Sequence, residues 1–214
     1  MPAQARGSAA RGGTYVGLKI GQSLAKISAA PEGYTIGYRP GLLVGGFIDH
    51  ISPSGVLGTR AELLYTKQGF TYDSATVHGT VTNQYISLPA LTTVNLGHGV
   101  VQVQFGFQAS YLLSSTDSNP APAPPPPAPG TPAQAAQLTS ALSALNRFDY
   151  GPLAGLEINP VAGLCLGARY NLGLNNLYQR QNNNSANSLF ALANPYSFDT
   201  KNVVLHFYLG YKIK

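Results

Sequence analysis

Eight segments of this chain alternate apolar and polar side chains with a period of two residues. In the clearest one, 101–111, Val, Phe, Ala and Tyr occupy one face while Gln, Gly and Ser occupy the other. Because successive side chains of an extended strand point to opposite faces, this pattern predicts strands with one apolar and one polar face. The predicted strands cover residues 14–22, 38–50, 56–69, 83–96, 101–111, 148–158, 162–172 and 202–213.

The connections between these segments alternate strictly between long and short. Tight turns are predicted at 52–55, 97–99 and 159–160, whereas longer links cover 23–37, 70–82, 114–147 and 174–201. Short turns at one end and long loops at the other are typical of outer-membrane barrels, whose tilted strands need roughly 9–11 residues to cross a bilayer. The sequence therefore predicts an all-β fold, an eight-stranded antiparallel up-and-down transmembrane β-barrel over residues 13–214. Residues 1–12 are predicted to form a flexible N-terminal tail.

The composition favours lipid, rather than water, around the apolar face of this barrel. Only 10 % of the residues are charged, whereas a soluble domain carries about 25 %. The polar face holds most of the strand glycines, which suits a narrow lumen with little room for large side chains. Tyrosines of the apolar face, expected near the strand ends, are typical of an aromatic girdle at the membrane boundary. The predicted girdle consists of Tyr38, Tyr65, Tyr111, Tyr150 and Tyr170 at the long-loop rim and Tyr211 at the other rim. A soluble barrel is the alternative.

These features predict a location in the bacterial outer membrane, with lipid as the direct partner. Residues 1–13 contain no apolar signal-peptide core, so a signal peptide is expected to have been removed or to lie upstream. The net charge of +5 is scattered rather than gathered in a basic run, so nucleic acid is not an expected partner. Cys165 is the only cysteine, which excludes an intrachain disulfide and a thiolate metal cluster.

Charged residues gather on the predicted inward face of the strands. They are the cations Lys19, Arg39, Arg60, Arg169 and Lys212 and the carboxylates Asp49, Glu62, Asp149 and Glu157. The signs nearly balance, and a buried charge needs a partner because an unpaired one is costly. The favoured interpretation is an ion-pair network that fills the lumen. The alternative is a narrow, selective pore for ions or small solutes.

The longest link, 114–147, contains a Pro/Ala-rich stretch at 119–132 that favours a semi-rigid polyproline II arm. Long insertions in loops cost little chain entropy, so a tolerated insert is the first interpretation and a docking arm or lid outside the cell is the second. The Asn-rich stretch 175–187 is expected to be solvated, and the more apolar stretch 189–198 is a candidate for peptide or lipid contact. Other envelope or secretion proteins are therefore hypothetical partners of the outer loops.

Signals for catalysis are weak. The histidines His50, His78, His98 and His206 lack the spacing of metal ligands. Asp73 and Ser74 share one predicted outer loop with His78, which leaves a rim-located lipid-modifying enzyme as an alternative function. Activation of such a serine requires a hydrogen-bonded geometry that sequence does not reveal. We expect a non-enzymatic protein without a metal site or cofactor.

Four short motifs within the predicted strands are similar to those of one bacterial family. They are ELLYTKQGF at 62–70, YISLP at 85–89, ARYNLGL at 168–174 and LGYKI at 209–213. In the order and spacing of these motifs the chain resembles the PorT-type outer-membrane β-barrel family of Bacteroidota. It departs from the family in the Pro-rich insert of the third long loop and in ending on Lys214, where many outer-membrane barrels end on an aromatic residue. The resemblance implies an eight-stranded barrel of OmpX/OmpA-like architecture, and one family member is tied to type IX secretion. Glu62 and Arg169 lie inside these motifs and are the first candidates for the lumen network. The expected function is a membrane anchor or interaction module, accessory to type IX protein secretion.

Overall fold

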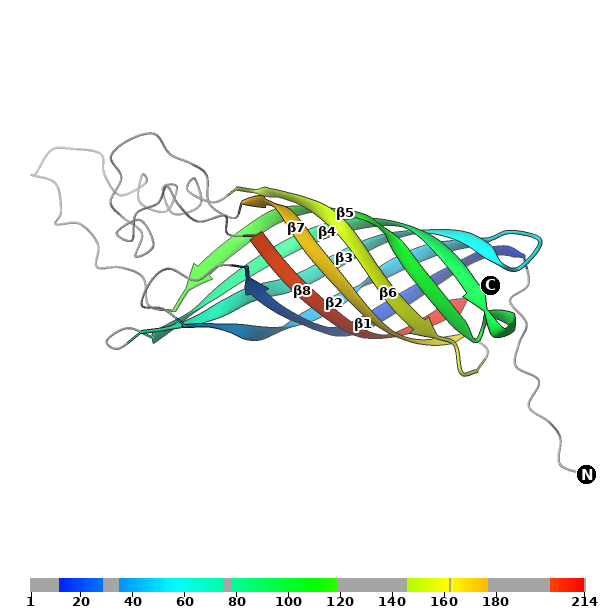
Figure 1. Cartoon of the computed structure of the whole chain (residues 1–214), viewed down its shortest axis with the longest axis horizontal. Coiled ribbons are helices and arrows are strands. Elements are labelled where there is room, and N and C mark those ends of the chain that lie inside the picture. Colours follow the sequence, from blue (N-terminus) through cyan, green and yellow to red (C-terminus); the bar gives the residue numbers. More distant parts are fainter. Residues whose placement is uncertain are drawn as a thin grey trace, which may run out of the picture.

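A computed structural model describes residues 12–28, 35–74, 78–118, 146–161, 163–176 and 201–213, apart from the side chain of His98. This part of the chain contains the strands β1 (Gly13–Ile27), β2 (Thr35–Ile51), β3 (Leu57–Asp73), β4 (His78–Leu96), β5 (Val101–Asp117), β6 (Phe148–Ile158), β7 (Leu164–Asn176) and β8 (Lys201–Ile213), with a short 3₁₀ turn at Gly97–Gly99. Each strand pairs antiparallel with the next, and β1 pairs with β8 to close the barrel (Figure 1). The predicted fold class is confirmed. Most of the predicted N-terminal tail, the Pro/Ala-rich stretch 119–132 and residues 177–200 lie outside the described residues.

The three tight turns lie at the same end of the barrel as the C-terminus (Figure 1). Gly55 and Gly163 have φ angles of 73° and 84°, which only glycine adopts at little cost. The amide of Gly55 donates to the carbonyl of Ser52 at 2.9 Å, and the Asn159 side chain donates to the carbonyl of Gly99 at 3.0 Å, joining two neighbouring turns. Short connections and local hydrogen bonds therefore order this rim.

Side chains alternate between the lumen and the outer surface as the period-two pattern predicts. On β5, Gln102, Gln104 and Gln108 are buried, whereas the intervening Phe105 and Phe107 are 48 % and 64 % exposed. Leu18, Ile20, Leu63, Leu88 and Leu156 are also more than half exposed on the outer face of their strands. The outer surface of the closed barrel is thus an apolar belt. No described helix has the length and apolar character to cross a bilayer.

Several strands run further toward the long-loop end than predicted. β4 begins at His78 rather than at residue 83, and β5 continues to Asp117 rather than ending at 111, so the links between strands are shorter than predicted. Toward this end the outward face becomes polar and the inward face gains apolar residues, although Asn83 is also buried inside. Thr82 and Gln84 point outward, while Val81 and Tyr85 are buried inside in one apolar cluster with Ile27, Phe70, Tyr72 and Leu112. Outward side chains that contact water instead of lipid are expected to be polar. The alternation of apolar outward and polar inward residues, which predicts a membrane strand, therefore stops before the strand itself ends.

Candidate functional site

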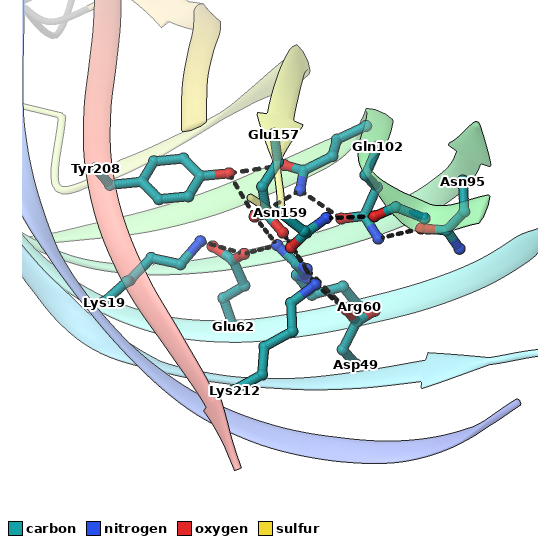
Figure 2. Close-up of polar contacts among 12 residues, drawn as sticks. Lys19, Asp49, Arg60, Glu62, Asn95, Gln102, Glu157, Asn159, Tyr208 and Lys212 are labelled. Atoms are coloured by element: carbon teal, nitrogen blue, oxygen red, sulfur yellow. Dashed lines mark hydrogen bonds and ion pairs between the residues drawn. The ribbon is translucent and has the colours of Figure 1, made fainter. Parts of the chain in front are cut away.

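Seven charged side chains meet inside the barrel, where six strands position them. Lys19 comes from β1, Asp49 from β2, Arg60 and Glu62 from β3, Glu157 from β6, Arg169 from β7 and Lys212 from β8. Six of them are buried, and the Lys212 side chain is 12 % exposed. Figure 2 shows the convergence of most of these residues on the centre of the lumen. We call this group the lumen cluster.

One half of the lumen cluster is built around Arg60. Its Nη1 and Nη2 atoms lie 2.6 and 3.0 Å from the two carboxylate oxygens of Glu157, and Nη2 also lies 2.7 Å from Asp49 Oδ2. Lys212 Nζ lies 3.1 Å from Glu157 Oε1 and 3.4 Å from Asp49 Oδ2. The bidentate contact fixes the guanidinium in one orientation, because two parallel N–H···O bonds add geometric specificity as well as energy.

The other half is built around Glu62. Arg169 donates from Nη1 to Glu62 Oε2 at 2.8 Å and from Nη2 to Oε1 at 3.0 Å. Lys19 Nζ lies 2.7 Å from the same Oε1 atom, and Arg60 Nη1 lies 4.0 Å from it. The last contact joins the two halves, so each carboxylate of the lumen cluster has at least two cationic neighbours.

Neutral side chains add hydrogen bonds to the lumen cluster, in which Asp49 Oδ1 and the Nε atoms of Arg60 and Arg169 have no hydrogen-bond partner. Gln104 accepts a hydrogen bond from Arg169 Nη2 at 2.7 Å and donates to Glu157 Oε2 at 3.1 Å and to Gln102 at 2.8 Å. The Tyr208 hydroxyl lies 3.0 Å from Glu157 Oε2. Gln102 in turn donates to Asn95 at 2.9 Å (Figure 2). These contacts link the two halves a second time, as expected where buried polar atoms need partners.

Two aromatic rings support the buried cations. Lys19 Nζ lies 4.0 Å from the centre of the Tyr208 ring, and Arg60 Cζ lies 4.6 Å from the centre of the Phe47 ring. Such placement is attractive because the face of an aromatic ring is negative. A Cβ atom at Gly17 would overlap the Phe47 ring, and one at Gly167 would overlap the Tyr208 ring. These two glycines of the polar face therefore leave room for the aromatic rings that lie against the buried cations.

Two of the charged residues expected on the inward face lie away from the lumen cluster. Arg39 lies on the inward face of β2 but makes no ion pair with a described residue. It is six residues along the strand from Gly45, the partner of Lys19, which corresponds to about 20 Å at the rise of a strand. Asp149 also lies apart and accepts a hydrogen bond from Asn202 at 3.1 Å. Alternation predicts the face of a residue but not its height in the barrel.

Gln104, Phe47 and Tyr208 contact charged residues of the lumen cluster directly but were not among the predicted site residues. Gln104 lies on the predicted polar face of 101–111, so its position was visible from the sequence although its partners were not. Phe47 and Tyr208 are aromatic residues on inward faces, and nothing in the sequence distinguishes them from lipid-facing aromatic residues except the parity of their positions.

The six predicted girdle tyrosines all point outward. Tyr38, Tyr111, Tyr150, Tyr170 and Tyr211 are about half exposed, and Tyr65 donates from its hydroxyl to Gln84 at 2.7 Å. Tyr65 lies opposite Ile86, which lies opposite Tyr111 on the next strand. Tyr65 thus occupies the middle of β3 instead of its end, which corrects the expected position, because the strand continues into the outer extension.

Of the residues considered for catalysis, Asp73, Ser74 and His78 lie together at the end of the β3–β4 hairpin, whereas His50 and His206 lie elsewhere. His78 Nδ1 lies 2.7 Å from Asp73 Oδ1, and both side chains are exposed at the tip of the β3–β4 hairpin. His50 lies at the opposite rim, with its Nδ1 atom 3.0 Å from Thr14 Oγ1, while His206 is buried in the lumen. Within the described ranges, no three His, Cys, Asp or Glu side chains are grouped so that they could hold a metal ion.

The closed eight-stranded ring with an apolar outer belt and a charged interior defines a bacterial outer-membrane β-barrel. Residues 3–179 match the family model described as an outer membrane protein beta-barrel domain, and the chain belongs to this family. The predicted location in the outer membrane is thereby confirmed. The search of curated proteins gave no match.

Two solved structures illustrate the similarity to known barrels. The attachment invasion locus protein Ail of Yersinia pestis, solved with the heparin analogue sucrose octasulfate, is 13 % identical over 94 % of this chain and 99 % of its own, with a TM-score of 0.45. The translocator domain of the autotransporter NalP from Neisseria meningitidis is 13 % identical over 94 % of this chain and 88 % of its own, with a TM-score of 0.36.

Proposed function

We propose that this protein is a non-enzymatic barrel with a plugged lumen that anchors an interaction module in the outer membrane. The observation that carries this proposal is the pair of bidentate contacts across the lumen. Arg60 on β3 binds Glu157 on β6, and Glu62 on β3 binds Arg169 on β7. In a ring of eight strands, β3 and β7 are diametrically opposite. An eight-stranded barrel has an interior that side chains just fill, so these bridges occlude it.

The lumen cluster also argues against the narrow channel considered from the sequence. A permeating ion would have to separate buried ion pairs, and breaking one leaves an uncompensated charge in a low-dielectric interior. A conducting filter instead binds ions weakly enough to release them. For the enzyme alternative, the exposed position of the Asp73–His78 pair offers no pocket that would exclude water from a reaction.

Planar bilayers test the plug directly. We expect the purified wild-type protein to give no steady conductance steps, because the ion pairs occupy the lumen. The quadruple variant Arg60→Ala/Glu157→Ala/Glu62→Ala/Arg169→Ala removes both bridges, with two cations and two carboxylates, while leaving Lys212 and Asp49 to pair at 3.4 Å. This variant should conduct and thereby shows that the assay detects an open lumen. Regular openings of the wild-type protein would refute the plug.

We further propose that the loop-bearing rim serves a protein partner as an accessory of type IX secretion. The support is the series of motifs shared with the PorT-type barrels, which includes Glu62 and Arg169, both central to the lumen cluster. The outward tyrosines are proposed to mark the membrane boundary, with the outer extension of β3, β4 and β5 projecting beyond it. This arrangement would present the long connections to the exterior while the plug keeps the membrane sealed.

A secretion assay tests this role. In a bacterium that encodes this protein and a type IX system, deletion of the gene should strongly reduce the release of type IX cargo into the medium, as measured by immunoblotting. Expression of the wild-type chain from a plasmid should restore release. Normal cargo release in the deletion strain, with the protein shown to be absent from its outer membrane, would remove the secretion role and leave the plugged barrel untouched.

A further inference from the structure

One buried titratable side chain of the lumen takes no part in the lumen cluster. His206 on β8 points inward and is only 1 % exposed. Both of its ring nitrogens, Nδ1 and Nε2, lack a hydrogen-bond partner among the described residues. A neutral imidazole carries one donor and one acceptor, and burying either of them unpaired is costly. The closed barrel therefore holds this ring without satisfying it.

The two residues opposite His206 are engaged elsewhere. The strand register places His206 directly opposite Arg169 on β7 and Ser23 on β1. Side chains in directly opposed positions of neighbouring strands lie within contact range. Arg169 directs its Nη1 and Nη2 atoms to Glu62, and the Ser23 hydroxyl donates to the carbonyl of Lys67. His206 is thus the direct neighbour of a residue that forms one of the two bridges across the lumen.

The charged groups that face His206 offer it no free counter-ion. Arg169 of β7 and Lys19 of β1 act on the ring as cations, and Glu62 of β3 acts on it as an anion. Glu62 is already paired with both of these cations. The lumen cluster as a whole contains four cations, Lys19, Arg60, Arg169 and Lys212, but only three carboxylates, Asp49, Glu62 and Glu157. A proton on His206 would therefore add to an excess of positive charge.

The remaining inward titratable groups do not change this balance. Asp149 of β6 contacts Asn202, which is four residues along β8 from the histidine, a separation of about 13 Å at the rise of a strand. Tyr208 of β8 and Cys165 of β7 are neutral in their ordinary forms at neutral pH. Arg39 on the inward face of β2 is a further cation. Within the described part of the chain, the neighbouring elements thus supply no carboxylate that is free to pair with the ring.

We propose that His206 makes the plug sensitive to acid, because protonation of its ring weakens the adjoining Arg169–Glu62 bridge and favours an open, hydrated lumen. This inference rests on the plugged lumen proposed above. In the closed state a proton on the ring adds a cation directly beside Arg169. In the open state water supplies partners for both ring nitrogens and screens the two positive charges, so the ring takes up a proton from the solvent there.

The size of the effect follows from the coupling of proton uptake to opening. A histidine in water has a pKa of about 6.5. Above that pH the ring is neutral in both states, and the closed state keeps its full stability. Below it the open state binds one proton more than the closed state, so the ratio of open to closed barrels rises by up to about tenfold for each unit of pH. Between about pH 7.5 and about pH 5 this ratio should rise about 30-fold.

Planar bilayers test the switch in a barrel that keeps a single bridge. The double variant Arg60→Ala/Glu157→Ala removes one cation and one carboxylate and retains the Arg169–Glu62 bridge beside His206. Its ratio of open to closed time should rise about 30-fold from about pH 7.5 to about pH 5. Adding His206→Gln should abolish most of this rise, because glutamine is polar but takes up no proton in this range.

His50→Gln in the same double variant is the matched control. His50 is exposed at the turn rim, with its Nδ1 atom 3.0 Å from Thr14 Oγ1, so the acid response should remain. A full response in the presence of His206→Gln, or no response in the double variant itself, would overturn the proposal. Either result leaves the plug in place as long as wild type stays closed at neutral pH, whereas wild-type openings at neutral pH refute the plug.

Urea unfolding of the protein in detergent micelles gives a second measurement that does not depend on channel opening. The unfolded chain exposes His206 to water, so acidification over the same range should raise the unfolding constant of wild type about 30-fold more than that of His206→Gln. If His206→Gln is not recovered in a folded state, His206→Asn takes its place in both experiments. An equal pH dependence in wild type and the variant would exclude the switch, since the closed barrel would then accept the proton without cost.

Discussion

Replacement of Glu62 by glutamine is expected to lower the free energy of unfolding by about 3–5 kcal/mol. Glu62 is the shared partner of Arg169 and Lys19, at 2.7 to 3.0 Å. Glutamine has nearly the same shape but no charge, so both cations would remain buried without their counter-ion. A urea titration of the protein in detergent micelles or lipid vesicles, followed by intrinsic tyrosine fluorescence or circular dichroism, measures the loss.

Ser87→Ala provides the control for the loss of an uncharged lumen contact. The Ser87 hydroxyl lies 2.9 Å from the Ser110 hydroxyl in the same lumen and is fully buried. Its removal should cost about 0.5–1.5 kcal/mol, the usual range for a neutral hydrogen bond. If Glu62→Gln lowers the free energy of unfolding no more than Ser87→Ala does, the lumen cluster contributes hydrogen bonds but no essential charge compensation. The ion pairs would then not explain the plug.

The second large effect is expected on the lipid-facing side. Ala90→Arg should cost about 2–4 kcal/mol, the range for an arginine near the bilayer midplane of a membrane barrel. Ala90 is exposed on the outer face of β4, between Ala61 on β3 and Phe107 on β5. Alanine is the suitable starting residue because the substitution removes almost no apolar contact. A folding titration into lipid vesicles measures the change.

Thr82→Arg is the matched control on the same strand and the same outward face. Thr82 lies eight residues from Ala90, in the outer extension opposite Gly69 and Thr116. Beyond the tyrosine row an arginine contacts water or lipid headgroups, so the expected cost is about 0–1 kcal/mol. Equal costs for the two variants would mean that the apolar belt does not face lipid at Ala90, or that the membrane boundary lies elsewhere on β4.

Much of the fold was accessible from local chemistry. The strand predicted at 148–158 coincides with β6, and the tight turns occur where Gly and Pro interrupt the alternation. The lumen face of β5 was also predictable, because Gln102 and Gln104 alternate with lipid-facing residues. These features depend on neighbouring residues alone, since period two, turn chemistry and the exclusion of charge from lipid operate within a few residues.

The outer extension shows where this local reasoning stops. Strands β3, β4 and β5 continue past the last lipid-facing positions, and there the buried face gains apolar residues, as Val81 and Tyr85 illustrate. A reader of the sequence who follows lipid-facing apolar residues ends the strands too early. The backbone ladder continues because hydrogen bonds between neighbouring strands do not depend on what the outer face contacts.

The sequence by itself determined that the chain forms alternating strands with charge on one face and lipid-compatible residues on the other. It determined this because side-chain parity along a strand is a local property. Only the tertiary structure decided which charges meet. Seven converge while Arg39 and Asp149, on the same face, do not, because height in a barrel depends on strand register and on closure between β1 and β8. Those are contacts between residues far apart in the chain, so Glu62 finds Arg169 across 107 positions only when the ring is complete.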